Sequence, residues 1–115
     1  MAYNIKEAAQ SLLVEEEELL EILDVFILET SKSLEHCEAA LKSKDYEALK
    51  KIFHTLKGTS SNFRAVTLSD IAAAMEKTIT SEEDGSHLPD LLAKFRKEFE
   101  AMQQLLAQCT PPKAI

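Results

Sequence analysis

The chain has 115 residues, 13 of them basic and 20 acidic, and its formal net charge is −7. This acidic balance argues against nucleic acid or anionic membranes as partners, and no apolar run approaches the roughly 20 residues that a membrane span needs. Two cysteines without paired-motif spacing predict a reducing compartment, and no basic stretch precedes an apolar core at the N-terminus. We therefore expect a cytoplasmic protein without a signal peptide.

The composition predicts a single helical domain that spans residues 1–115. Leucine, alanine, glutamate and lysine dominate the sequence and favour helices, whereas only 2 glycines and 3 prolines are present to form turns. A chain of this length can bury one hydrophobic core without disulfides or metal ions.

Capping residues and apolar periodicity predict the first two helices. A short helix over residues 4–12 begins at Asn4, with Glu7 in the capping position three residues later. A long helix follows from about Glu15 to Lys42 and begins with four glutamates, which the helix dipole favours at this end. We interpret these glutamates as structural, although a metal or partner site there stays open. The predicted core stripe of this helix is Leu20, Leu23, Ile27, Thr30, Leu34, Cys37 and Leu41.

Three further helices complete the predicted fold. Asp45 caps the third, whose inner face is Tyr46, Leu49, Phe53 and Leu56. The fourth begins at Thr67, and its stripe is Leu68, Ile71, Met75 and Ile79. A loop over residues 80–86 leads to Ser86, which caps a last helix that ends before Pro111. The stripe of that helix is Leu88, Leu92, Phe95, Phe99, Met102, Leu106 and Cys109. The sequence thus predicts an all-α antiparallel four-helix bundle with a short N-terminal helix.

A polar stripe on the third helix is the candidate functional feature. His54, Lys57, Gly58 and Ser61 are spaced at i, i+3, i+4 and i+7, and Lys50 lies one turn earlier. Glycine inside a helix costs about 1 kcal/mol relative to alanine, so its presence here needs a reason. The simplest reason is that another molecule must come close to His54.

The pattern His-x-x-Lys-Gly-x-Ser, formed by His54, Lys57, Gly58 and Ser60, resembles the motif of histidine phosphotransfer (HPt) domains. These all-helical domains carry a phosphoryl group between partner proteins in two-component phosphorelays. The resemblance implies that His54 is the phospho-acceptor and that the chain is a phosphoprotein intermediate rather than an independent enzyme. In the phosphotransfer domains of chemotaxis kinases a glutamate 22 residues after the histidine orients the ring. Since 54 + 22 = 76, Glu76 is the candidate here, and a solvated surface glutamate is the alternative.

The remaining site residues are assigned to phosphoryl oxygens and to the partner. Lys57, together with Lys50 or Lys51, would attract phosphoryl oxygens. The docking surface would be formed by Lys50, Gly58, Ser61 and Arg64. Arg64 stands where the family commonly has a second glycine, ten residues after the histidine. Arginine avoids the left-handed backbone that glycine tolerates, so we predict that the third helix continues through Asn62 or beyond. The Arg64 side chain would then reach the basic face.

The resemblance also implies the partners. We expect a response-regulator receiver domain and a histidine kinase or hybrid kinase, with this chain as a monomer. No cofactor is expected on this chain, since Mg²⁺ would be required by the receiver alone. The sequence leaves open which receivers take part, in which direction the phosphoryl group flows, and whether the chain is a fragment of a larger kinase.

Other uses of these residues are weaker. Di-iron bundles use Glu-x-x-His pairs, and none of the three histidines has a glutamate three residues earlier. His36 and His87 are interpreted as incidental, and both cysteines as apolar packing residues. No phosphate-binding glycine loop supports ATP binding. The remaining alternative is a helical adaptor that binds partners through the same face and leaves the histidine unused.

Overall fold

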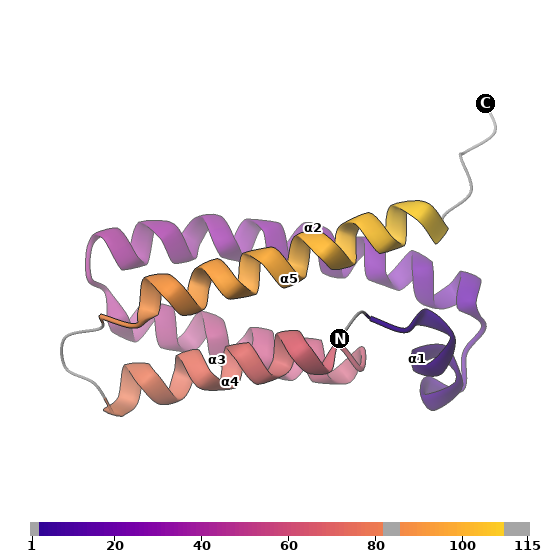
Figure 1. Cartoon of the computed structure of the whole chain (residues 1–115), viewed down its shortest axis with the longest axis horizontal. Coiled ribbons are helices and arrows are strands. Elements are labelled where there is room, and N and C mark those ends of the chain that lie inside the picture. The colour runs from indigo at the N-terminus through magenta and orange to yellow at the C-terminus, as the bar shows by residue number, and fades with distance from the viewer. Residues whose placement is uncertain (1–2, 82–85, 110–115) are drawn as a thin grey trace.

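The computed structural model describes residues 3–81 and 86–109, and this part of the chain is all helical apart from short connections (Figure 1). Its helices are α1 (Ile5–Leu12), α2 (Glu16–Lys42), α3 (Tyr46–Asn62), α4 (Val66–Ser81) and α5 (Leu88–Cys109). The predicted all-α fold is confirmed. None of these helices is both long and apolar enough to cross a bilayer.

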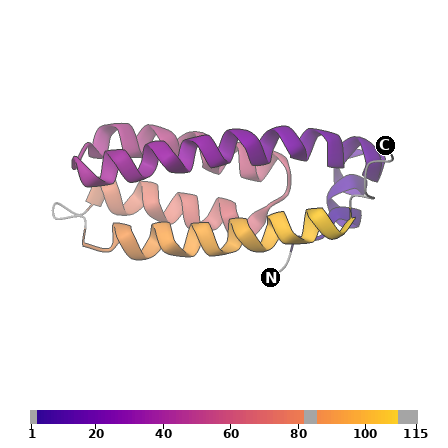
Figure 2. The same cartoon turned by 90° about the horizontal axis from the view of Figure 1, so that it is seen from above.

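Helices α2 to α5 form the bundle. Each packs against the next along the chain, and α2 also contacts α5, which closes a ring of four antiparallel helices (Figures 1 and 2). The short helix α1 packs against α2 at one end of the bundle. The connections after α2 and α3 are only a few residues long, so sequential helices must lie side by side.

The predicted helix starts at Asn4 and Asp45 are confirmed by their caps. The Asn4 side chain accepts a hydrogen bond from the Glu7 amide at 2.9 Å, and the Asp45 side chain accepts one from Ala48 at 3.2 Å. The acidic start of α2 is also a cap, because the Glu15 amide donates to the side chain of Glu18 at 3.3 Å. These contacts account for the glutamate run structurally.

Two predicted boundaries in the second half of the chain are wrong. Helix α4 begins at Val66, one residue before the predicted Thr67, and continues to Ser81 into the predicted loop. The rest of that loop, residues 82–85, and the expected stop at Pro111 lie outside the described residues.

The core runs along the facing stripes of the bundle, and the predicted stripe of α2 needs correction. Leu19, Phe26 and Ala40 are buried, whereas the predicted Leu20, Ile27 and Leu41 are only half-buried. Aromatic packing fixes this register, because the Phe26 ring lies 5.4 Å from Phe63 and 6.5 Å from Phe99 between ring centroids. The buried residues of α5 are Leu88, Leu92, Phe95, Phe99, Met102 and Leu106, as the sequence predicts.

Cys37 lies within this core, as predicted. Its side chain is fully buried, and that burial raises the pKa of the thiol to about 12. The side chain of Cys109 lies outside the described part of the structure.

Helix α3 ends in a way the sequence did not predict. The helix does continue to Asn62, but Arg64 then adopts the left-handed conformation, with φ of 63°. The Arg64 amide bonds to the carbonyl of Ser61 at 3.0 Å, and the Ala65 amide bonds to the carbonyl of Ser60 at 2.8 Å. This pair of bonds is a Schellman motif, which requires a left-handed residue at this position whatever its side chain. The prediction of a right-handed Arg64 is therefore wrong.

Candidate functional site

The candidate site lies on the face shared by α3 and α4. Leu49, Phe53, Leu56 and Ser60 fill the inner side of α3. At about 100° per residue, His54, Lys57 and Ser61 then fall on the flank that faces α4. A hydrogen bond from the Ser69 hydroxyl to the Lys57 carbonyl, 3.3 Å long, joins the two helices there. Ser69 was not predicted, although it lies seven residues before Glu76 and therefore on the same helix face.

His54, Glu76 and Lys57 form one hydrogen-bonded group. His54 Nδ1 lies 2.7 Å from Glu76 Oε2, and Lys57 Nζ donates to Glu76 Oε1 at 2.8 Å. The imidazole is 68% exposed, whereas the Glu76 side chain is only 19% exposed. The carboxylate is thus held between the helices while the ring it contacts stands in solvent.

Glu76 remains ionised at lower pH than an ordinary glutamate. The hydrogen bond from Lys57 is the largest cause of its lowered pKa, and the bond with His54 adds to it. A carboxylate with a lowered pKa stabilises the fold fully when the pH is above the ordinary pKa of glutamate. This stabilisation is lost as the pH falls through the lowered pKa. The group is therefore intact at neutral pH.

The contact with Glu76 decides which ring nitrogen is free. An ionised carboxylate can only accept a hydrogen bond, so a neutral His54 ring must carry its proton on Nδ1. Nε2 then holds the lone pair on the far side of the exposed ring. The arrangement leaves a single nucleophilic nitrogen available to a reactant from solvent.

The surface around the ring is open. A Cβ atom added at Gly58 would meet no other atom within 4 Å, and Gly58 is exposed one turn after His54. Lys50 and Ser61, which share this stripe, are exposed as well. A large partner could therefore approach the imidazole along α3.

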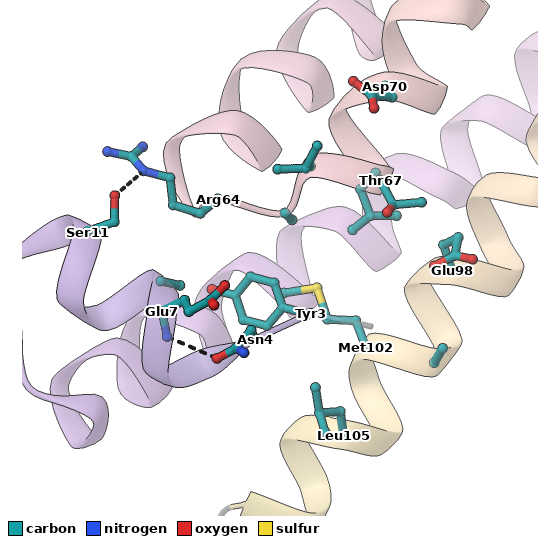
Figure 3. Close-up of a pocket in the computed structure, with 15 residues that line it drawn as sticks. Tyr3, Asn4, Glu7, Ser11, Arg64, Thr67, Asp70, Glu98, Met102 and Leu105 are labelled. Carbon is teal, nitrogen blue, oxygen red and sulfur yellow. Dashed lines mark hydrogen bonds between the residues drawn. The ribbon is translucent and has the colours of Figure 1, made fainter. Parts of the chain in front are cut away.

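Arg64 is not arranged as the sequence predicted. Its Nε donates to the Ser11 hydroxyl of α1 at 2.8 Å (Figure 3). Its Nη1 donates to the carbonyls of Ser61 and Asn62, at 3.2 Å in each case. The side chain therefore closes the end of α3 and ties it to α1 instead of joining the Lys57 group. A contact between Arg64 and a partner protein stays a prediction.

The other candidate sites gain no support from geometry. Within residues 3–81 and 86–109, no three metal-ligating side chains of histidine, cysteine, aspartate or glutamate lie together. His36 and His87 are exposed, and in the described structure neither contacts a carboxylate.

Fold and site together define a class of protein: a helical bundle that carries an exposed, hydrogen-bonded histidine on its surface rather than in a cleft. The family model of the Hpt domain matches residues 21–107, and the chain belongs to this family. Comparison with curated proteins and with solved structures found no significant match. Membership of the Hpt family assigns the chain a general role in phosphorelay signalling, together with the receiver domains and kinases of two-component systems.

Proposed function

We propose that His54 is the phospho-acceptor of this Hpt domain and passes the phosphoryl group between a donor and a receiver. The observation that carries this proposal is the exposed imidazole whose Nδ1 contacts Glu76 and whose Nε2 is free. The donor is either the aspartyl phosphate of a receiver domain or a histidine kinase, and a second receiver is the final acceptor.

In the forward step the Nε2 lone pair attacks phosphorus. With a receiver domain as the donor, a nitrogen–phosphorus bond forms and the bond between phosphorus and the aspartate oxygen breaks, so the donor leaves as a carboxylate. The phosphorylated ring keeps its Nδ1 proton and becomes cationic. Glu76 offsets this charge through the hydrogen bond that it already accepts, so no proton needs to move. Transfer to the second receiver is the reverse of this step.

Lysines of α3 supply the positive charge that the incoming group requires. Lys57 is half-exposed, and it contacts the same carboxylate, Glu76, as the His54 ring. Lys50 lies one turn before His54. Both can approach phosphoryl oxygens at the cost of a small side-chain movement. Mg²⁺ belongs to the receiver in this scheme, and we propose that the domain acts as a cytoplasmic monomer with no catalytic centre of its own.

Incubation with a receiver domain that carries a radiolabelled aspartyl phosphate tests the proposal. We expect label to move to the parent chain in a form that is stable to alkali and labile to acid, as a phosphoramidate is. His54→Gln should abolish labelling without changing the helical signal, since the ring is exposed. His36→Gln, on the exposed side of α2, is the matched control and should label normally. Unchanged labelling of His54→Gln would refute the assignment, and a parent that binds receivers without being labelled would support the adaptor alternative.

A further inference from the structure

A cleft of about 450 Å³ opens where α1, the start of α4 and the second half of α5 meet (Figure 3). Its floor is apolar and includes the buried side chains of Ala8, Leu68 and Met102. This volume falls in the range of about 300–1,000 Å³ that is typical of small-molecule sites. The cleft is therefore large enough for an organic ligand.

Hydrogen bonds between the elements hold the walls of the cleft in place. The Tyr3 hydroxyl donates to the carbonyl of Phe63 at 2.8 Å, and Arg64 reaches Ser11 on the other wall. The first bond joins the segment before α1 to the end of α3, and the second joins α1 itself to it. A cleft that is already formed does not require a ligand to order its walls, which reduces the entropic cost of binding.

The polar groups around this apolar floor are acidic. Glu7, Asp70 and Glu98 line the cleft, one from each of its three helices. Within the described structure no hydrogen bond or ion pair reaches any of these carboxylates. Among the described residues of the lining, Arg64 is the only basic one, and it donates to Ser11 and to the end of α3 instead. An anion would be repelled here, whereas a cation would gain an electrostatic attraction that a neutral ligand lacks.

We propose that this cleft binds a small organic cation, in which a primary ammonium or guanidinium group is attached to an apolar chain or ring. The cationic group neutralises the acidic rim while the apolar part covers the floor around Met102. Asn62, the last residue of α3, lies about 12 Å along the helix axis from His54, and Arg64 lies beyond it. The cleft is thus a second site, distinct from the phosphoryl-accepting face.

Titration with three probes of equal chain length tests this proposal: hexylammonium, hexanol and hexanoate. Binding is followed at neutral pH by amide chemical shifts of the ¹⁵N-labelled full chain. With hexylammonium we expect saturable shifts in α1, the start of α4 and the second half of α5. Hexanol should bind at least about fivefold more weakly than hexylammonium. Hexanoate should cause no saturable change. Equal affinities for hexanol and hexylammonium, or shifts spread along the acidic face of α2, would overturn the proposal.

Two variants separate this site from general attraction to an acidic protein. Glu98→Gln should weaken hexylammonium binding several-fold, whereas Glu35→Gln, exposed on α2, changes the net charge equally and should have no effect. Ala101→Phe places a ring in the cleft from an exposed position of α5 and should abolish binding while helicity is retained. An equal response of the two charge variants, or unchanged binding to Ala101→Phe, would refute the site. Phosphorylation of His54 is not part of any readout, so this test is independent of the proposed function.

Discussion

Replacing two of the left-handed residues at the helix ends with glycine should separate backbone strain from side-chain bonding. Lys44 after α2 and Arg64 after α3 have φ values of 58° and 63°, and each is followed by the same pair of Schellman bonds. A left-handed residue other than glycine costs about 1–2 kcal/mol. Glycine removes this cost, but its greater conformational freedom in the unfolded chain destabilises the fold by about 0.5–1 kcal/mol. Lys44→Gly should therefore raise the free energy of unfolding by about 1 kcal/mol.

Arg64→Gly should give a smaller gain, because the arginine side chain forms bonds that glycine cannot replace. These are the bonds to the Ser11 hydroxyl and to the carbonyls of Ser61 and Asn62. Each contributes about 0.5–1.5 kcal/mol net, and the low end applies because Arg64 is exposed. Their loss cancels most of the backbone gain, so we expect a change close to zero.

Urea unfolding followed by circular dichroism measures both changes. For a domain of this size Lys44→Gly should move the midpoint upward by about 0.3–1 M, while Arg64→Gly stays near the parent. Ser11→Ala should destabilise the parent slightly but should have no effect in the Arg64→Gly background. Equal stabilisation by the two glycine variants would show that the Arg64 bonds contribute nothing. A neutral or destabilising Lys44→Gly would refute the backbone argument itself.

Four further predictions concern the site and the core. Glu76→Gln should slow acceptance of the phosphoryl group about tenfold, because a neutral amide offsets the cationic ring poorly, and single-turnover labelling measures this rate. Gly58→Leu should be as stable as the parent or up to about 0.8 kcal/mol more stable, since a Cβ atom added at Gly58 meets no neighbour and leucine favours the helix. The variant should nevertheless accept phosphoryl groups more slowly, and an unimpaired rate would place Gly58 outside the docking surface. Ser60→Ala should stabilise the fold by about 1 kcal/mol in urea titrations, because the buried Ser60 hydroxyl has no hydrogen-bond partner in the described structure. Cys37 should resist alkylation at pH 8 until the protein unfolds, as its pKa of about 12 leaves about one thiolate in ten thousand, and peptide mapping would distinguish it from Cys109.

Local sequence signals were sufficient to predict most of the helices. Asn4 and Asp45 mark helix starts because their side chains can satisfy amides that the first turn leaves free. The register of α2 was harder, since Leu19 and Leu20 are adjacent and both apolar, as are Phe26 and Ile27. Periodicity cannot show which of two such neighbours is buried. At Phe26, contacts with the rings of Phe63 and Phe99 fix the buried position.

The end of α3 shows the limit of reasoning from propensity. Arginine is a poor left-handed residue, and this argued for a continuing helix. The bond between Arg64 and Ser11 joins residues 53 positions apart, so no local pattern could reveal it. Tertiary bonding from the side chain, together with the two backbone bonds of the Schellman motif, outweighs the conformational preference.

The candidate site combines a stripe of residues on one helix, which the sequence predicts from spacing, with a contact between two helices, which the sequence alone does not determine. His54, Lys57 and Gly58 share one helix, so their spacing alone places them on one stripe. Glu76 comes from another helix, and its position relative to His54 depends on how α3 and α4 pack. The two helices contact each other, with Leu56 and Ser60 buried on one and Leu68 and Ala72 buried on the other.

This division of α3 into two stripes explains how an exposed polar site is compatible with a stable fold. Phe53 is fully buried and the adjacent His54 is 68% exposed, because successive residues differ by about 100° around the helix. The core stripe therefore fixes the helix without using any polar side chain of the site. Glu76 is ionised and held from α4, so the ring is oriented without being buried. The bundle can thus present one nitrogen to a large partner while its hydrophobic core remains closed to water.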